Sequence, residues 1–181
     1  MKKVTSFLLM VFTLLLVVGC EMNLTPTKKV EELLGKYERK DESVLSQLEK
    51  TIEEAGTMND SQKDDYRRLM ERQYEYIYYK IKEEKIDGNN ASVSVEIEVY
   101  DYGKAITDAE TYLTTNQEEF IDEETKATDP IKFLDYKIKK MQKIEDRITY
   151  TINFTLTKKD GKWEIDELSD IDRLKLHGLY Y

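Results

Sequence analysis

The sequence predicts an α+β domain, in which N-terminal helices precede a curved antiparallel sheet of about four strands. Three observations predict it: apolar residues recur at helical spacing up to Ile77, apolar and polar residues alternate from Ala91 to Val99, and a second alternating run starts at Ile148. Such a pattern is typical of a sheet with helices on one face and solvent on the other. We therefore expect the order helices, hairpin, helical crossover, hairpin.

Three amphipathic helices open the body. The first begins at Thr25-Pro26, where a capping hydroxyl precedes a proline suited to the first helical position. The second begins after Asp41 and stops at Gly56, and the third is capped by Asp60 or Ser61. Their apolar stripes are Val30, Leu33, Leu34 and Tyr37; Val44, Leu45, Leu48 and Ile52; and Tyr66, Leu69, Met70, Gln73, Tyr74 and Ile77.

The first hairpin follows Tyr78, where the apolar period changes toward two. Its turn is Asp87-Gly88-Asn89-Asn90, a strong turn signal between two extended runs. The second arm is the clearest strand of the chain, because side chains alternate regularly between an apolar and a polar face. The inward set is Ala91, Val93, Val95, Ile97 and Val99, and the outward set is Ser92, Ser94, Glu96 and Glu98.

Two helices form the crossover to the second hairpin. One lies between Ile106 and Gln117, and the other starts at Asp129-Pro130 after a polar stretch. Their stripes are Ile106, Ala109, Tyr112 and Leu113, then Ile131, Leu134, Ile138 and Met141. A strand from Ile148 to Leu156, a turn at Lys159-Asp160-Gly161 and a return strand through Trp163, Ile165 and Leu168 complete the sheet.

This order, with the phrases TPTKKVEELLGKY, ASVSVEIEVYDY and DPIKFLDYKIKKM, resembles lipoproteins of uncharacterised function from Gram-positive bacteria. The resemblance covers most of residues 25–172. It implies a cystatin-like or nuclear-transport-factor-like domain, whose sheet often encloses a cavity. The motifs are helix caps and apolar alternation, so they indicate fold and location more strongly than activity.

The N-terminus has the pattern of a lipoprotein signal peptide. Lys2 and Lys3 precede the apolar run Val4 to Val18, which Gly19 and Cys20 follow. The sequence Val17-Val18-Gly19-Cys20 resembles the bacterial lipobox, which implies a diacylglyceryl thioether on Cys20 and cleavage before it. We expect residues 1–19 to be the signal peptide, residues 20–25 the lipidated cysteine with a short tether, and residues 26–181 a single α+β domain.

Two other interpretations of this segment are weaker. A membrane-spanning helix needs about 20 apolar residues, and the run from Val4 to Val18 is shorter and contains Thr5, Ser6 and Thr13. Plain secretion usually ends in an Ala-x-Ala-like site, and it leaves a reactive, unpaired thiol at Cys20. We therefore expect a lipid anchor on the outer face of the cytoplasmic membrane, with the membrane as partner. Two acyl chains suffice for stable anchoring.

Composition excludes several function classes. The formal charge is −9, and it becomes −11 without the signal because Lys2 and Lys3 leave with it. An acidic body does not bind phosphate backbones, so nucleic acid is excluded as a partner. Cys20 is the only cysteine, so no internal disulfide can form. No hydrolase, metalloprotease or phosphate-loop motif is present, and we expect no cofactor and no metal.

Two possible polar sites have simpler interpretations. His177 is the only histidine, and metal sites need several converging ligands, so we interpret it as a surface or packing residue. The acidic residues Asp166, Glu167, Asp170 and Asp172 lack the glycine turn of a calcium loop. They are therefore interpreted as a solvated acidic edge.

A speculative pocket involves Tyr76, Tyr79 and Asp101. The run from Tyr74 to Tyr79 is rich in tyrosine, which suits ligand sites but equally suits a helix-to-strand junction whose rings complete the core. Asp101 continues the inward phase of its strand and could act as a general base at a pocket mouth. In the alternative, the strand ends at Tyr100 and Asp101 lies in solvent before Gly103.

We favour a non-enzymatic, lipid-anchored extracytoplasmic domain that binds a small ligand, a peptide or an envelope protein. The alternative is a small pocket enzyme of the isomerase or hydratase type, which uses Asp101 with tyrosine hydroxyls; its requirement is that these groups line one apolar cavity. A third possibility is a purely structural partner domain, which an exposed apolar patch on the sheet would indicate.

Overall fold

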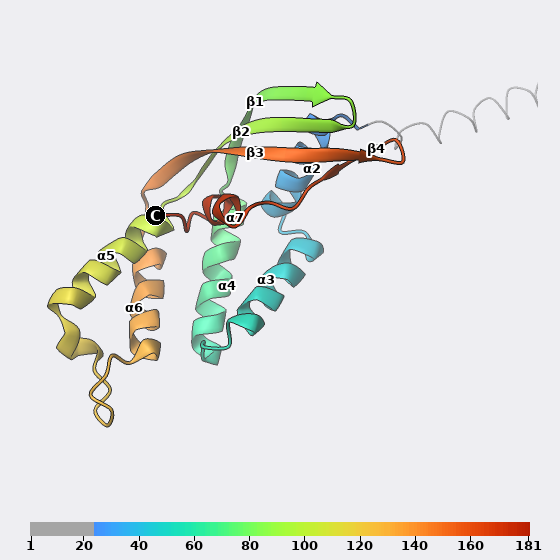
Figure 1. Cartoon of the computed structure of the whole chain (residues 1–181). Coiled ribbons are helices and arrows are strands. Elements are labelled where there is room, and N and C mark those ends of the chain that lie inside the picture. Colours follow the sequence, from blue (N-terminus) through green and yellow to red (C-terminus); the bar gives the residue numbers. More distant parts are fainter. Residues whose placement is uncertain (1–23) are drawn as a thin grey trace, which may run out of the picture.

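The computed structural model describes residues 24–181 and has the predicted α+β architecture (Figure 1). Its described elements are the six α-helices α2 (Pro26–Glu38), α3 (Glu42–Ala55), α4 (Asp60–Glu75), α5 (Tyr102–Thr115), α6 (Pro130–Gln142) and α7 (Asp170–Leu176), the 3-10 helix η1 (Gln117–Phe120), and the strands β1 (Tyr78–Asp87), β2 (Asn90–Tyr100), β3 (Arg147–Lys159) and β4 (Lys162–Ile165). The helices α2 to α4 precede the strands, as predicted.

The four strands form one antiparallel sheet in the order β1-β2-β3-β4. The sheet curves over the helices, which all lie on one side of it (Figure 1). The inward set of β2 is buried and lies beside the buried residues of β3 on the same sheet face, where Val93 pairs with Phe154 and Val95 with Ile152. The register of β1 shifts between Ile81 and Glu83, and such an irregularity bends a strand. Because the inward strand residues are buried and the helices lie on that side of the sheet, the core fills the space between the inner sheet face and the helices.

Side-chain caps start most helices where the sequence predicts. The side chain of Thr25 accepts a hydrogen bond from Lys28 N and Pro26 occupies the first turn of α2, while Asp41 and Asp129 cap α3 and α6. Gly56 ends α3 in the left-handed conformation, with φ +61°. The predicted cap of the third helix was wrong by one or two residues, because the cap is Asn59.

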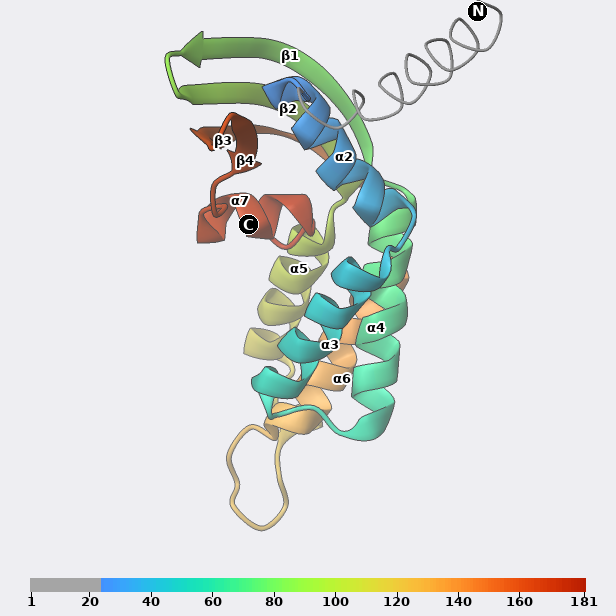
Figure 2. The ribbon, with the colours of Figure 1, turned by 90° about the vertical axis from the view of Figure 1, so that its right-hand side faces the viewer.

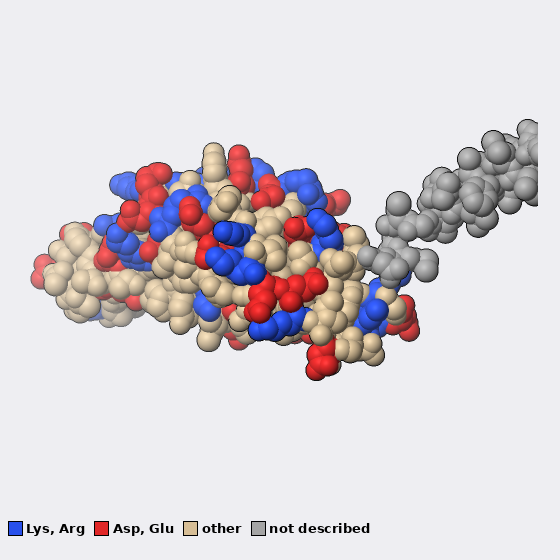
Figure 3. All heavy atoms as spheres, turned by 90° about the horizontal axis from the view of Figure 1, so that it is seen from above, with Lys and Arg blue, Asp and Glu red and all other residues tan. Residues whose placement is uncertain are grey.

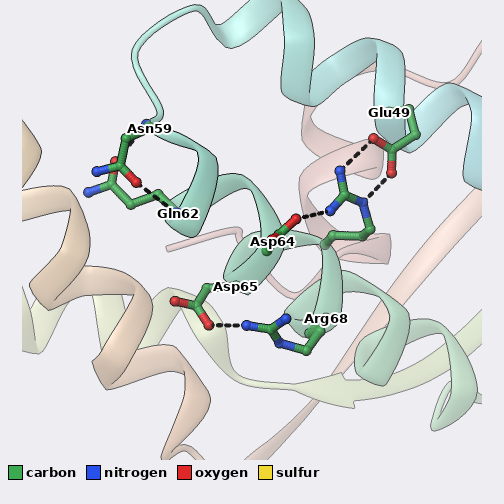
Figure 4. A network of polar contacts seen from close by, with 7 residues as sticks. Glu49, Asn59, Gln62, Asp64, Asp65 and Arg68 are labelled. Atoms are coloured by element: carbon green, nitrogen blue, oxygen red, sulfur yellow. Dashed lines mark hydrogen bonds and ion pairs between the residues drawn. The ribbon is translucent and has the colours of Figure 1, made fainter.

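Asn59 begins α4 through a reciprocal capping box with Gln62 (Figure 4). Asn59 Oδ1 accepts from Gln62 N at 3.0 Å, and Gln62 Oε1 accepts from Asn59 N at 3.1 Å. This arrangement satisfies two free backbone donors at once. The buried Gln62 also donates through Nε2 to Ile131 O at 2.8 Å, which ties α4 to the start of α6. An ion pair between Arg67 and Glu49 joins α4 to α3.

The pairs α3–α4 and α5–α6 extend from beneath the sheet in the same direction (Figures 1 and 2). The second pair has its own aromatic cluster, Tyr112, Phe120, Phe133 and Tyr136, with ring centroids 5.2 to 6.3 Å apart. The connection between α5 and α6 contains η1 and a single bridge between Ile121 and Thr128. The polar stretch predicted there is therefore mostly a loop.

The C-terminal helix α7 was not predicted. The return strand ends at Ile165 and does not reach Leu168, and α7 then crosses beneath the sheet (Figure 2). Ser169 caps it by accepting from Asp172 N at 3.1 Å. Asp170 and Asp172 lie in its first turn, where the helix dipole stabilises carboxylates. Part of the predicted acidic edge is thus the start of a helix.

The outer face of the sheet is polar. Seen from above, acidic and basic side chains are intermixed there, and neither sign forms a continuous patch (Figure 3). Cross-strand ion pairs contribute to this mixing, such as Lys82 with Glu96 at 3.0 Å and Lys159 with Glu164 at 3.0 Å. Among residues 24–181, no helix has the length and apolar character needed to cross a bilayer.

Candidate functional site

An open groove lies between α3, α4 and α7, on the helical side of the molecule. Its volume is about 740 Å³. Figure 2 shows α3 in front of α4 and α7 above them, under the sheet. The end of α2 closes the groove through Tyr37. Ligand sites in proteins commonly have volumes of about 300 to 1,000 Å³, so the groove is large enough for a small organic molecule.

Helical spacing places the apolar floor of the groove. Val44 and Leu48 lie four residues apart on α3, and Tyr66, Met70 and Tyr74 lie at intervals of four on α4, and all five line the groove. Residues at this spacing share one face of a helix. The two stripes are core residues, as the sequence predicts: Val44, Leu48, Met70 and Tyr74 are 1 to 7% exposed, and only their outermost atoms reach the groove.

Three rings form one wall of the groove. The ring centroids of Tyr37 and Tyr74 are 5.0 Å apart, those of Tyr74 and His177 are 5.6 Å apart, and those of Tyr37 and His177 are 6.1 Å apart. The two contacts of Tyr37 are edge-to-face, with interplanar angles of 72° and 64°. Aromatic pairs favour this geometry. The wall thus joins α2, α4 and the end of α7 in one packed unit.

His177 is held in a neutral state by its surroundings. Its Nδ1 is buried and has no hydrogen-bond partner in the described part of the chain. Burial lowers the pKa of His177 to about 4, because the charged form would lose its hydration. Its main-chain carbonyl accepts from Gln73 Nε2 at 2.9 Å, which fixes the end of α7 against α4. The packing interpretation of His177 agrees with these contacts.

The hydroxyls of Tyr37, Tyr66 and Tyr74 are the polar groups that a ligand could use. Burial raises the pKa of each of them, so all three are protonated donors at neutral pH. None makes a side-chain hydrogen bond within residues 24–181, and none is among the buried unpartnered atoms, so their hydroxyls reach the surface of the groove. A bound molecule could therefore accept hydrogen bonds from the floor.

The rim of the groove carries five charged side chains. Arg173 pairs with Glu167 at 2.9 Å and with Asp170 at 2.5 Å, and Lys50 lies 3.7 Å from Glu54 on α3. The rim therefore has two cations and three carboxylates. One negative charge is in excess, and it lies at the α7 side, where two carboxylates share one guanidinium.

The speculative pocket residues lie elsewhere. Tyr76 follows the last turn of α4 and is 52% exposed, with its ring 6.1 Å from that of Tyr100. Tyr79 is partly buried against the core at the start of β1. Asp101 begins α5 by accepting from Lys104 N at 2.9 Å, because the strand ends at Tyr100. None of the three lines the groove.

The acidic residues near the C-terminus have structural partners. Asp166 accepts from Thr157 Oγ1 at 2.9 Å, and Asp172 accepts from the hydroxyl of Ser169 at 2.7 Å. Within residues 24–181, no group of three or more His, Cys, Asp or Glu side chains is arranged to hold a metal ion. Glu167 and Asp170 belong to the rim of the groove, which the sequence did not indicate.

One signal for the groove was present in the sequence. Three large side chains at intervals of four on α4 showed which face of that helix is apolar, but not that this face stays partly open. The contact of α4 with His177 was not visible, because Gln73 and His177 are 104 positions apart and α7 was not predicted.

The chain has no recognised relative in three comparisons: no protein-family model matches it, and neither curated proteins nor solved structures are significantly similar to it. The cystatin-like or nuclear-transport-factor-like label therefore stays a prediction. The signal peptide and Cys20 lie outside the described residues, and the lipid anchor likewise stays a prediction.

Proposed function

We propose that this chain is a lipid-anchored binding protein of the outer face of the cytoplasmic membrane, and that its groove between α3, α4 and α7 holds a small ligand. The observation that carries the proposal is the groove: about 740 Å³, an apolar floor, and tyrosine hydroxyls that have no side-chain hydrogen bond within residues 24–181. Mostly apolar concave sites with a few polar groups are the usual form of ligand sites.

The ligand is bound and not transformed. A catalytic base works best with a pKa near the working pH, whereas the pKa of His177, the only histidine, is about 4. The enzyme alternative requires Asp101 and tyrosine hydroxyls in one cavity, but Asp101 caps α5 and does not line the groove. The groove offers donors and apolar surface, which are suited to recognition.

The anchor follows from the sequence. The lipobox-like Val17-Val18-Gly19-Cys20 implies a diacylated Cys20, and α2 begins six residues later at Pro26. Five residues span at most about 18 Å when fully extended. The ligand is therefore captured close to the bilayer, and the domain acts as a resident membrane-surface receptor.

A blocked groove tests the proposal. Thr51 is exposed on α3 and lines the groove, so Thr51→Trp fills the opening without disturbing the core. Glu53 is exposed on the same helix and does not line the groove, so Glu53→Trp is the matched control. The lipid-anchored protein in nanodiscs is screened against a fragment library by thermal shift.

We expect fragments that stabilise the wild type and Glu53→Trp but not Thr51→Trp, since only a ligand bound to the folded state raises the melting temperature. A library that stabilises none of the three proteins, or that stabilises Thr51→Trp equally, would contradict the proposal.

A further inference from the structure

We infer that the groove selects amphipathic cations, that is, protonated amines attached to an aromatic or aliphatic body. This inference rests on the proposed binding function of the same groove. It follows from the combination of three features that no single element provides: the excess carboxylate at the rim, the uncharged aromatic wall, and the exposed apolar side chain beside them.

The rim favours a positive charge at one defined place. Glu167 and Asp170 both contact the guanidinium of Arg173, so one of their two charges is not compensated. Lys50 is already beside Glu54. An anionic ligand would meet no unpaired cation at the rim, whereas an ammonium group can join the two carboxylates next to Arg173.

The wall favours the same charge for a second reason. The faces of aromatic rings carry negative potential and attract cations. Tyr37 is partly exposed and supplies such a ring at the groove, while Tyr74 packs against it and is only 3% exposed. His177 beside them is uncharged at neutral pH and does not repel a cation.

The apolar body of such a ligand has its own contact surface in the groove. Leu174 lines the groove, is 42% exposed and lies one turn from Asp170 on α7, so it offers most of the apolar area. The floor residues Val44, Leu48 and Met70 are only 1 to 7% exposed and contribute their outermost atoms. Covering exposed apolar surface stabilises a complex. A ligand with an apolar body on the floor and an ammonium at the α7 rim satisfies both regions at once.

The field of the whole molecule acts in the same direction. Residues 20–181 carry a formal charge of −11, because the 26 Lys and Arg that remain without the signal face 37 Asp and Glu. A strongly acidic protein raises the local concentration of cations and their association rate. This general attraction of cations is not specific to the groove, so the experiment must distinguish it from the effect of the rim carboxylates.

Three probes with one indole body test the inference: tryptamine carries a positive charge, tryptophol is neutral, and indole-3-acetate is negative. Equilibrium dialysis measures their retention by the full lipid-anchored protein in nanodiscs at low salt. Nanodiscs with Thr51→Trp measure retention by lipid and surface, which is subtracted.

Exposed ion pairs are weak, so we expect tryptamine to bind only about fivefold more tightly than tryptophol, and indole-3-acetate to bind more weakly than either. The rim variant Glu167→Gln/Asp170→Asn should remove most of this preference while tryptophol binds unchanged. The control variant Glu123→Gln/Glu124→Gln also removes two negative charges, but in the exposed loop between η1 and α6, which does not line the groove. It should keep the preference for tryptamine.

The outcomes distinguish a failure of the binding function from a failure of the inferred charge preference. If no probe is retained beyond the Thr51→Trp background, the binding function itself fails. If tryptophol or indole-3-acetate binds as tightly as tryptamine, the groove binds ligands but the inferred charge class is wrong. If both double variants lose the preference equally, the net charge of the protein causes it and the rim has no role.

Discussion

The side-chain amide of Gln73 makes both main-chain hydrogen bonds of Tyr100. Gln73 Nε2 donates to Tyr100 O at 3.1 Å, and Tyr100 N donates to Gln73 Oε1 at 2.9 Å, so the amide acts as a neighbouring strand would at the end of β2. The same Nε2 donates to His177 O. One buried side chain on α4 therefore fixes the end of the sheet and the end of α7, which carries one side of the groove.

Replacing Gln73 with methionine should cost about 3 to 5 kcal/mol of unfolding free energy. Methionine keeps the length of the side chain but leaves an N–H of Tyr100 and the carbonyls of Tyr100 and His177 unsatisfied in a buried site. Each such group costs about 1 to 3 kcal/mol. Urea unfolding of residues 21–181 measures the change, and Gln117→Met, an exposed position in η1, should change it by less than about 0.5 kcal/mol. A small cost for the Gln73 variant would show that these groups find other partners.

Gly178→Ala should destabilise the fold more than Gly161→Ala, although both glycines have positive φ, +68° and +79°. A Cβ at Gly178 would overlap Gln73 Nε2 and Tyr100 O, whereas a Cβ at Gly161 has nothing within 4 Å. The Gly161 variant pays only the left-handed backbone cost, about 1 kcal/mol. We expect a loss at least twice as large for Gly178 in the same urea measurement. Equal losses would mean that the end of α7 moves aside without cost.

The sequence predicted most of the fold because its signals are local. Caps at Thr25, Asp41 and Asp129 and the regular alternation of β2 are read from neighbouring residues, and the structure confirms them. The helix α7 was missed because it has only seven residues, and of its three apolar residues, Ile171, Leu174 and Leu176, only Leu176 is buried. A helix this short is stabilised by tertiary contacts more than by its own sequence.

The groove could not be predicted for a related reason. Its residues come from α2, α3, α4 and α7, and its openness depends on how far α7 lies from α3, which no local pattern encodes. Asp101 illustrates the opposite error. Its inward phase suggested a pocket, but the strand ends one residue earlier and the carboxylate caps the next helix. Such a capping contact satisfies a free N–H and orders the helix start.

Substitution of Cys20 should release the protein from the membrane. The lipobox-like sequence implies that the mature chain begins at a diacylated Cys20, and two acyl chains hold a protein stably on a bilayer. Metabolic labelling with palmitate and mass spectrometry of the mature N-terminus measure the modification. We expect label on the wild type and none on Cys20→Ser. Label that persists in the variant, or a mature chain that begins at another residue, would refute the anchor.

Acidification should weaken the fold through His177 in a defined pH range. The pKa of His177 is about 4 in the folded chain, below the ordinary value of 6.5, so the unfolded chain binds more protons between these two values. This contribution is fully present above pH 6.5, is lost as the pH falls toward 4, and changes no further below it. Its upper limit is about 3 kcal/mol, since each pKa unit corresponds to 1.36 kcal/mol.

The variant His177→Asn isolates this contribution, because asparagine does not titrate while the carboxylates of the chain are unchanged. Unfolding free energies of both proteins at several pH values from 7.5 to 4 give the difference. We expect the unfolding free energy of the wild type to fall by up to about 3 kcal/mol more than that of the variant over this range. The difference should develop between pH 6.5 and 4. Parallel pH profiles would mean that His177 is protonated as easily in the folded chain as in the unfolded one, and that the wall of Tyr37 and Tyr74 does not exclude its charge.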